Sequence, residues 1–339
     1  MVKNKNMPIS KKILKNFICP KCKSKIHADN SIYSCENLEC SIKYPVIDGI
    51  PILINEDNSI FNINDFNIHN KTTITSKNNT RLTRLKSKLL PKIGINLKAK
   101  QNYYTFLSTL VKNSSNRNVL VIGGEATGSG MESLINTNEI ELIETDVSFG
   151  SRTMIICDGH DIPFENDTFD GVIVQAVLEH VVDPYRCVEE IHRVLKNDGL
   201  VYSETPFMQQ VHMGRHDFTR FTHLGHRRLF RKFEEIESGA VCGPGMALAW
   251  SIQYFFLAFT KSKKIRKLII YFTIFTSFFW KYFDYYLIDR EGSYDSASGY
   301  YFFGKKSNTT LSDRDLISSY RGSQPVSYTH LTLPTIYSV

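Results

Sequence analysis

The chain has 339 residues, 42% of them hydrophobic, and a formal net charge of +7. That length allows two domains, or one domain with substantial additions, around a full core. Its seven cysteines follow no N-terminal apolar segment, which argues against an exported, disulfide-bonded protein and for a reducing compartment, by default the cytoplasm.

The charge is unevenly distributed along the chain. Residues 1–118 contain 20 Lys and Arg against 7 Asp and Glu, whereas residues 119–236 contain 10 against 20. A basic front of this kind suggests an anionic partner, or contact with the acidic half of the same chain. Nucleic acid, an anionic membrane surface and a merely solvated basic linker all remain open.

Four cysteines form the first motif. Residues 1–16 are polar and are expected to be flexible, and the cysteines that follow come in two close pairs, Cys19 with Cys22 and Cys35 with Cys40. Two such pairs about a dozen residues apart supply the four thiolates of a closed structural zinc site. Because so small a unit buries little apolar area, the metal would supply much of its folding free energy. The alternative, four unrelated buried cysteines, fits this clustering less well.

The segment 17–55 also resembles a known family. It has a C-P-x-C knuckle, the second cysteine pair and then the run Y-P-V-I-D-G-I-P-I-L, as in the small zinc-ribbon activators of tRNA, translation-factor and rRNA methyltransferases. In that family the ribbon binds a methyltransferase and stabilises it. The resemblance therefore implies a zinc ribbon that acts on a methyltransferase fused to it in the same chain.

A basic linker is predicted next. Residues 56–100 are rich in Asn, Thr and Lys, with one basic helix expected around residues 81–90. In residues 101–112 apolar side chains recur with the spacing of one helical face, so this segment is expected to be helical.

From residue 118 to 239 strand and helix signals alternate. The predicted strands are NVLVIG, ELIET, TMIIC, DGVIVQ and LVYSET. Residues 183–196 are a predicted helix, with Asp183 as N-cap, Pro184 in the first turn and an Asn-Asp-Gly stop. This alternation predicts an α/β fold with a doubly wound, Rossmann-like parallel sheet.

Residues that follow two of these strands suggest a nucleoside site. The first strand leads into the turn G-G-E-A-T-G-S-G, where Gly123, Gly124, Gly128 and Gly130 allow a ligand to approach the backbone closely. Asp146 ends the second strand, where doubly wound folds place a ribose-binding acid. A helix N-cap is the alternative role for this aspartate. The glycine spacing itself matches neither a dinucleotide fingerprint nor a P-loop.

The segment DGHDIPFENDTFDGVIVQAVLEHVVDP, residues 158–184, resembles class I S-adenosylmethionine-dependent methyltransferases, in particular the quinone-biosynthesis group. The likeness covers roughly residues 118–206. It implies S-adenosylmethionine as cofactor, with Glu125 at its ammonium group, Asp146 at the ribose and Asp158 at the adenine amine. The implied cofactor-binding residues are Gly123, Gly124, Glu125, Gly128, Gly130, Asp146, Asp158, Gly159, His160, Gln175, Glu179 and His180.

Two features depart from the family pattern. Val121 stands where the first strand usually carries an acidic residue. Asp146 and Asp158 are separated by so few residues that the helix between the second and third strands must be short or absent. These departures bear on the wall of the adenine pocket more than on the chemistry.

Candidate groups for the methyl acceptor follow the fifth strand, in residues 206–222. A sulfonium methyl already has a good leaving group, so the protein mainly positions the acceptor, and a base is needed only if the nucleophile must lose a proton. The candidate bases are His212, His216 and Asp217. Arg215 and Arg220 are candidate ligands for an anionic acceptor. For each histidine, a structural hydrogen-bonding role is the alternative.

Two apolar stretches, residues 246–260 and 268–280, follow with a basic loop between them. Neither reaches the roughly 18–20 residues of a membrane-spanning helix, so helices that pack on the core or cap the domain are favoured. Docking of residues 246–288 on a membrane surface is the alternative, and a spanning hairpin is less favoured. Residues 298–306 are expected to close the sheet as an edge strand. Residues 307–339 are expected to form a disordered tail, whose last residues resemble sequencing-adapter read-through and carry no function.

Together these features predict a class I methyltransferase that acts on a small-molecule, glycan or lipid-linked acceptor. A methyltransferase for RNA or a translation protein is the second hypothesis, but the chain has no visible aromatic-plus-basic nucleic-acid module. A third is a non-catalytic cofactor-fold scaffold that uses the ribbon as an interaction module. A dehydrogenase would fit the fold class but not the glycine spacing.

Overall fold

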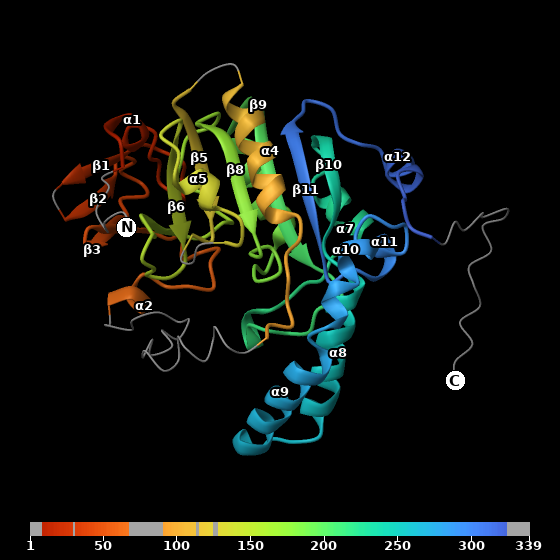
Figure 1. The fold of residues 1–339 in the computed structure, drawn as a ribbon. Coiled ribbons are helices and arrows are strands. Elements are labelled where there is room, and N and C mark those ends of the chain that lie inside the picture. The colour runs from red at the N-terminus through yellow and green to blue at the C-terminus, as the bar shows by residue number, and fades with distance from the viewer. Residues whose placement is uncertain (1–8, 30, 68–90, 113–114, 125–127, 324–339) are drawn as a thin grey trace, which may run out of the picture.

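A single mixed sheet organises the computed structural model, which describes residues 9–29, 31–67, 91–112, 115–124 and 128–323. Its strands are β1 (Ile26–Asp29), β2 (Ile32–Cys35), β3 (Lys43–Ile47), β4 (Ile50–Leu53), β5 (Arg117–Ile122), β6 (Ile140–Asp146), β7 (Ile155–Cys157), β8 (Phe169–Gln175), β9 (Leu195–Pro206), β10 (Phe233–Cys242) and β11 (Gly299–Lys306). They lie in the order β1-β2-β3-β4-β7-β6-β5-β8-β9-β11-β10 (Figure 1).

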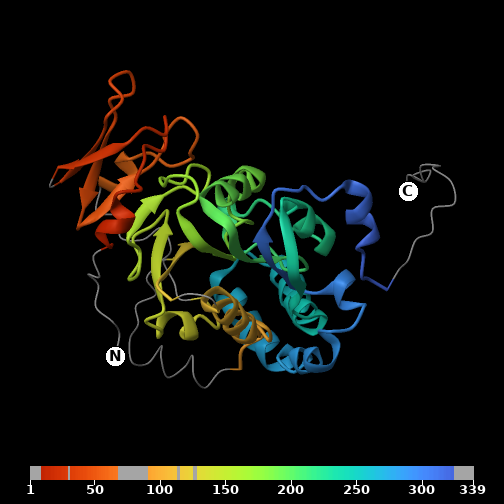
Figure 2. The same ribbon diagram turned by 90° about the horizontal axis from the view of Figure 1, so that it is seen from above.

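The helices flank this sheet and extend beyond it. They are α1 (Lys11–Leu14), α2 (Asn64–Asn67), α4 (Ala99–Val111), α5 (Glu132–Ile135), α6 (Pro184–Val194), α7 (His223–Leu229), α8 (Pro244–Ala258), α9 (Lys263–Ser277), α10 (Asp284–Leu287), α11 (Ser293–Ser296) and α12 (Asp313–Ser318). Figure 2 shows α4 on one face of the central strands and α6 on the other. The basic helix expected around residues 81–90 lies outside the described residues.

The central strands confirm the predicted doubly wound sheet. Strands β7, β6, β5, β8 and β9 are parallel, and the chain reverses its direction of winding between β5 and β8. Residues 147–154, which join β6 to β7, contain no helix, as the short spacing predicted. The carboxyl ends of β5 and β8 therefore meet at a topological switch point, where open α/β sheets bind ligands.

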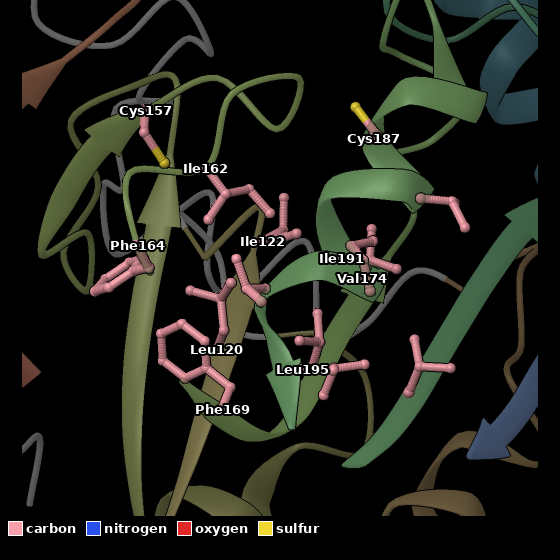
Figure 3. Close-up of a cluster of buried hydrophobic side chains, with 14 of the residues drawn as sticks. Leu120, Ile122, Cys157, Ile162, Phe164, Phe169, Val174, Cys187, Ile191 and Leu195 are labelled. Atoms are coloured by element: carbon pink, nitrogen blue, oxygen red, sulfur yellow. The ribbon is translucent and has the colours of Figure 1, made fainter. Parts of the chain in front are cut away.

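Alternate side chains of β5 pack on opposite faces of the sheet. Leu120 and Ile122 join a core cluster with Ile191 of α6 (Figure 3), while Val119 and Val121 join a second cluster with α4. The α6 helix begins as predicted, because the Asp183 carboxylate accepts a hydrogen bond from the backbone N–H of Arg186 at 3.1 Å. Both faces are therefore buried, as the near-continuous apolar strands require.

The sheet continues beyond β9 in a way that the sequence did not reveal. Strand β11 confirms the strand expected at residues 298–306, but it pairs antiparallel with both β9 and β10. It is thus an interior strand, and the edge is β10, which was not predicted. The segment β10 reads FEEIESGAVC, whose glutamates and glycine weaken the strand signal.

The N-terminal unit extends the opposite end of the sheet. Strands β1 to β4 form an antiparallel meander, and β4 pairs in parallel with β7, with Ile52 opposite Ile156. The expectation of flexibility for residues 1–16 needs correction from residue 9 onward. Helix α1 is capped by Ser10 and buries Ile13 completely.

Helices α8 and α9, residues 244–277, form a hairpin inserted between β10 and β11. The hairpin extends away from the sheet on the side of the carboxyl ends of β8 and β9 (Figure 1). Its base is held by the buried Asp284, whose carboxylate accepts hydrogen bonds from the backbone N–H groups of Gly245 and Met246 at 2.7 and 2.9 Å. Among the described helices, none has both the length and the apolar content needed to cross a bilayer.

The C-terminal segment is ordered further than expected. Residues 313–318 form α12, where Ser312 caps the helix and Leu316 is buried. The prediction of a disordered tail is therefore wrong for residues 307–323. The rest of the tail lies outside the described residues.

Candidate active site

One large cavity opens at the carboxyl ends of β5, β6, β8 and β9, with a volume of about 940 Å³. Predicted cofactor residues that line it are Gly123, Gly128, Asp146, Asp158, Gly159, His160, Gln175, Glu179 and His180. From the predicted acceptor loop it receives His212, Arg215 and His216. The two groups of residues, predicted separately, thus share one chamber.

The glycine-rich turn is shaped by close contacts. Gly123 has φ +80°, and a Cβ there would overlap the side chain of Val177. Gly130 has φ +89°, and a Cβ there would come within 2.7 Å of the backbone of Lys100 at the start of α4. Both contacts are packing contacts with other parts of the chain, but Gly123 also lines the cavity, whereas Gly124 and Gly130 do not. Glu125 lies outside the described residues.

Asp146 stands at the end of β6 on the cavity wall, where a ribose-binding acid was predicted. Its carboxylate accepts a hydrogen bond from the Ser148 hydroxyl at 3.0 Å. The position fits a cofactor ribose, and the role itself stays a prediction.

Asp158 is more tightly held than the sequence suggested. Its carboxylate lies 2.5 Å from both His160 Nδ1 and the Ser59 hydroxyl. Burial opposes ionisation of this group, but the hydrogen bonds from His160 and Ser59 lower the pKa of Asp158 overall. His160 Nε2 accepts from the backbone N–H of Asp183 at 3.0 Å, so this histidine joins the Asp158 turn to the start of α6.

A buried carboxylate network that sequence reasoning missed lies beside the glycine turn. Glu204 of β9 accepts hydrogen bonds from Tyr202 at 2.5 Å, Gln175 at 2.8 Å and Asn96 at 2.9 Å. Burial raises the pKa of Glu204, although these donors oppose the shift. The only signal in the sequence was an acidic residue in the buried part of β9.

The acceptor loop, residues 206–222, divides into cavity-lining and loop-holding residues. Arg220 donates to both carboxylate oxygens of Asp217 and to the carbonyl oxygens of Gln209 and Gln210. Burial raises the pKa of Asp217, but the hydrogen bonds from Arg220 and from the His212 backbone N–H outweigh it and hold this pKa well below its usual range. Neither Asp217 nor Arg220 lines the main cavity, so their contacts favour positioning of the loop over proton transfer or acceptor binding.

A segment that follows the ribbon covers this loop. Ile60 and Phe61 line the cavity, and the ring of Phe61 stacks on His216 at a centroid distance of 6.3 Å. The His216 Nε2 accepts a hydrogen bond from Arg215 Nε at 3.1 Å. Sequence reasoning placed Ile60 and Phe61 in a linker, and nothing in their composition pointed to the site.

Glu179 and His180, just after β8, lie next to His212 in the lining of the cavity. Their carboxylate oxygen and Nε2 atoms lie within 4.8 Å of one another. Burial is the main cause that raises the pKa of Glu179 to about 8. The three side chains therefore form a cluster at the acceptor end of the cavity.

The four cysteines of the N-terminal unit converge as a zinc site requires. Their sulfur atoms lie within 4.8 Å of one another, with Cys19 and Cys40 at 3.8 Å and Cys22 and Cys35 at 3.4 Å. Four thiolates around one tetrahedral zinc would be separated by about 3.8 Å, given Zn–S bonds of about 2.3 Å. The donor set thus fits Zn²⁺, with Cys19, Cys22, Cys35 and Cys40 as its ligands.

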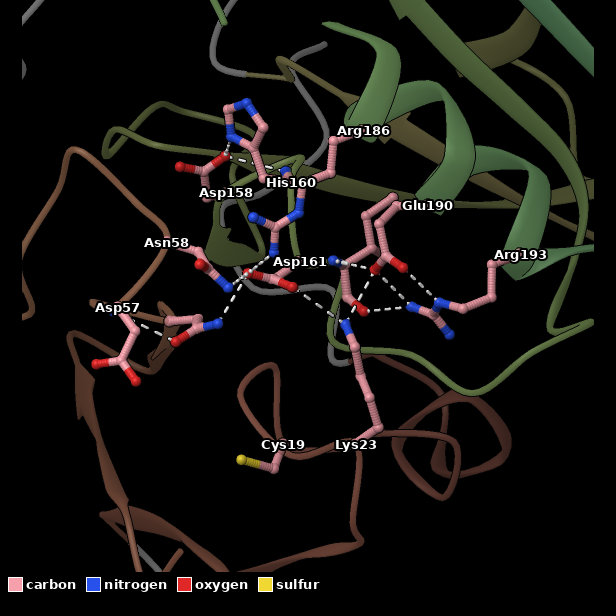
Figure 4. A network of polar contacts seen from close by, with 12 residues as sticks. Cys19, Lys23, Asp57, Asn58, Asp158, His160, Asp161, Arg186, Glu190 and Arg193 are labelled. Atoms are coloured by element: carbon pink, nitrogen blue, oxygen red, sulfur yellow. Dashed lines mark hydrogen bonds and ion pairs between the residues drawn. The ribbon is translucent and has the colours of Figure 1, made fainter. Parts of the chain in front are cut away.

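Polar contacts connect the N-terminal unit to the turn of residues 158–161, which carries Asp158 (Figure 4). Asp161 accepts from the Asn55 amide at 2.9 Å and pairs with Arg186 of α6 at 2.7 Å. Lys23, next to Cys22, reaches Asp161 at 3.4 Å and Glu190 at 3.1 Å. The turn that carries Asp158 is therefore held from the ribbon side and from α6 together.

The strand order and the cavity define a Rossmann-like methyltransferase fold of class I. Residues 130–203 match a protein family described as "Methyltransferase domain".

The chain is similar to known proteins over short segments of sequence, and to solved structures at low sequence identity. Over 48 residues the chain is 40% identical to the uncharacterized protein MJ1123 of Methanocaldococcus jannaschii, and over 52 residues 36% identical to the ubiquinone/menaquinone biosynthesis C-methyltransferase UbiE of Citrifermentans bemidjiense. These matches cover 14% and 15% of this chain, and 23% and 22% of the two relatives, so the chain spans less than a quarter of either. Among solved structures, phosphoethanolamine N-methyltransferase 2 of Haemonchus contortus has a TM-score of 0.38 at 16% identity, covering 61% of this chain and 53% of that one.

Proposed function

We propose that the chain transfers the methyl group of S-adenosylmethionine to a lipid-linked acceptor at a membrane surface. The observation that carries the methyl-transfer part is the shared chamber: Gly123 and Asp146, at the ends of β5 and β6, line the same cavity as His212 and Arg215 of the acceptor loop. When bound, the cofactor supplies an electrophilic methyl group, and the chain's own residues hold the cofactor and position the acceptor.

Binding of the cofactor is the first testable step. Replacing Asp146 with alanine is expected to weaken S-adenosylhomocysteine at least about 30-fold, because charge-assisted hydrogen bonds from a carboxylate contribute roughly 2 kcal/mol or more. Isothermal titration calorimetry of the full chain measures this affinity. Asp198→Asn, at an exposed residue outside the cavity lining, is the matched control. Equal affinities of the Asp146 variant and the wild type would contradict the proposed pocket.

The hairpin supports a membrane-bound acceptor. It exposes large apolar side chains, with Phe259 75% and Leu268 69% accessible, and others at Phe255, Ile265, Phe272 and Phe275. Exposed lysines at 261, 263, 264 and 267 lie at its tip. Exposed aromatics beside a lysine cluster suit the interface of an anionic lipid bilayer, whereas a protein partner or second copy of the chain would need no such concentration of positive charge.

The middle of helix α8 contacts the acceptor loop. Tyr254 of α8 donates a hydrogen bond to the carbonyl oxygen of Val211 at 3.1 Å, and Gln210 donates to Ser251 at 3.2 Å. A surface that holds the hairpin would therefore lie close to the acceptor end of the cavity. This arrangement favours an acceptor whose head group enters the cavity while its lipid stays in the bilayer.

Membrane binding is expected to depend on the hairpin tip. Phe259→Ser with Leu268→Ser should reduce co-sedimentation with phosphatidylglycerol-containing vesicles at least about tenfold, since burying each large apolar side chain contributes about 1.5–3 kcal/mol. Ile317→Ser, which removes an equally exposed side chain on α12, should bind like the wild type. A concentration-dependent dimer that the double substitution abolishes, without vesicle binding, would show that a second copy covers this face instead.

Transfer to a lipid-linked acceptor is tested separately. When the protein is incubated with membranes of its source organism and S-adenosylmethionine labelled in the methyl group, label is expected in the fraction extracted by organic solvent. The Asp146→Ala variant should abolish it. Label confined to water-soluble products would contradict the lipid-linked acceptor while leaving methyl transfer intact.

A further inference from the structure

The cluster of Glu179, His180 and His212 has a geometry that hydrogen bonding within the protein does not explain. The two histidine Nε2 atoms are 3.1 Å apart. Glu179 Oε1 lies 3.7 Å from the first of them and 3.9 Å from the second. All three donor atoms are on the wall of the main cavity or face it.

Neighbouring acceptors determine where the imidazole protons sit. His180 Nδ1 lies 2.8 Å from the backbone carbonyl oxygen of His216, which can only accept, so Nδ1 carries the proton and Nε2 keeps its lone pair. His212 Nδ1 lies 3.4 Å from both the Gln210 carbonyl oxygen and the Asp217 carboxylate, which assigns its proton in the same way. The two Nε2 lone pairs then face each other at hydrogen-bonding distance, which is favourable only with a cation between them.

The carboxylate of Glu179 points to the same cation. Its side chain is 1% exposed, and neither of its oxygens has a hydrogen-bond partner within the described part of the chain. A buried carboxylate without donors is costly. A proton shared by the two imidazoles would satisfy the histidines but would leave Glu179 unpartnered. A cation that all three residues bind gives each of the three side chains a partner at once.

We propose that Glu179, His180 and His212 bind a divalent transition-metal ion through one carboxylate oxygen and two Nε2 atoms. A metal about 2.1 Å from each ligand separates its ligands by roughly 3.0–3.6 Å at angles of 90–120°, and the observed separations of 3.1 to 3.9 Å need only a small contraction. Two imidazoles and a carboxylate suit Zn²⁺, Fe²⁺ or Mn²⁺. The His216 carbonyl and Asp217 hold the outer nitrogens, as second partners of metal-binding histidines do.

The ion would leave coordination positions open toward the cavity, because three protein ligands do not complete its shell. If the proposed methyl transfer holds, these positions lie at its acceptor end. An acceptor hydroxyl bound there would lose its proton more readily, since a metal ion lowers the pKa of a coordinated oxygen. The metal site itself does not depend on this role, and its test needs no cofactor.

Metal content of the full chain tests the site. After equilibration with a small excess of ZnCl₂ and dialysis, the wild type is expected to hold about two zinc ions per chain by mass spectrometry, one in the cysteine set and one here. His212→Ala, His180→Ala and Glu179→Gln should each hold about one, because loss of a ligand costs more than the roughly 10–100-fold that loss of a second-shell partner costs.

His216→Ala is the matched control. It removes a neighbouring cavity imidazole but keeps the backbone carbonyl that accepts from His180, so it should retain both ions. His212 is partly exposed, with 28% of its side chain accessible, so its replacement leaves the fold testable by circular dichroism. A wild type with only the cysteine-bound ion, or a folded His212→Ala variant that keeps both ions, would overturn the proposal.

Discussion

Replacing Cys19 and Cys22 together with serine is expected to remove zinc from the N-terminal unit and to unfold it. Zinc-finger peptides gain apparent binding free energies of about 10–16 kcal/mol at neutral pH, and without metal they do not fold. The buried apolar residues of the β1 to β4 meander belong to clusters that it shares with the central sheet, so the meander has no separate core that could replace the free energy of metal binding. Metal analysis and thermal unfolding of the full chain measure both consequences.

The effect should reach the methyltransferase domain, because the ribbon completes its sheet. Without β4, strand β7 becomes an edge, and Ile156, fully buried between Ile52 and its neighbours, is exposed to water. The Asp158 turn also loses Ser59 and Asn55 as partners. We therefore expect weaker S-adenosylhomocysteine binding and a greater tendency to aggregate.

Cys187→Ala is the control for this prediction. It removes a buried thiol from α6, away from the cysteine cluster, and should leave the ribbon zinc in place. The prediction would be wrong if the double serine variant kept its ribbon zinc, or if it lost zinc with no change in the unfolding transition. The second outcome would mean that the meander folds on the sheet without metal.

The sequence predicted the parts of this fold that local chemistry determines. The central strands and α6 carry continuous apolar runs or a capped amphipathic stripe, so their positions follow from neighbouring residues. Pairing of β4 with β7 joins segments about a hundred residues apart, and no local pattern encodes it. Strand β10 was missed because its glutamates suit solvent on an edge, which resembles a loop signal.

The same division holds for the site. Gly123 and Asp146 were predicted because a tight turn and a strand end constrain them locally. The sequence analysis assigned Glu179 and His180 to the cofactor and His212 to catalysis. The two imidazoles are 32 residues apart in the sequence, and nothing in the sequence indicates that their nitrogens nearly touch in the folded chain. Only the folded chain unites them, and the physical sign is an unpartnered buried carboxylate rather than any motif.

Two buried histidines on α7 are expected to contribute a loss of stability in acid, at pH values above the usual range of carboxylates. His226 is 1% exposed and His223 is 5% exposed. Burial lowers the pKa of His223 to about 4 and that of His226 to about 3. His223 is hydrogen-bonded to the Ser238 hydroxyl at 2.9 Å and His226 to the Ser203 hydroxyl at 3.0 Å. A hydroxyl partner can stabilise a neutral imidazole, but it does not offset a buried positive charge.

The sign of the effect follows from proton uptake. Between the ordinary histidine pKa of 6.5 and these lowered values, each of these two histidines binds more protons in the unfolded chain than in the folded one, so their contribution to the free energy of unfolding falls as pH falls below about 6.5. At pH 5 each histidine costs about 2 kcal/mol, given about 1.4 kcal/mol per pKa unit. Carboxylates with lowered pKa values contribute little at this pH, since their losses begin nearer the ordinary range of about 4. Carboxylates with raised pKa values, such as Glu179, have the opposite effect as pH falls, and they are the same in the wild type and in a histidine variant.

Urea unfolding at pH 7.5 and at pH 5.0 measures the difference directly. For His226→Gln the loss of stability between the two pH values should be smaller than in the wild type by about 2 kcal/mol, even if the variant is less stable at both. Loss of ribbon zinc in acid affects both proteins alike and cancels in this comparison. His27→Gln, at an exposed position of β1, should keep the wild-type difference. An identical pH dependence in His226→Gln and the wild type would mean that the α7 histidine is not buried in its neutral form, and that the contact between α7 and the sheet is looser than the Ser203 hydrogen bond implies.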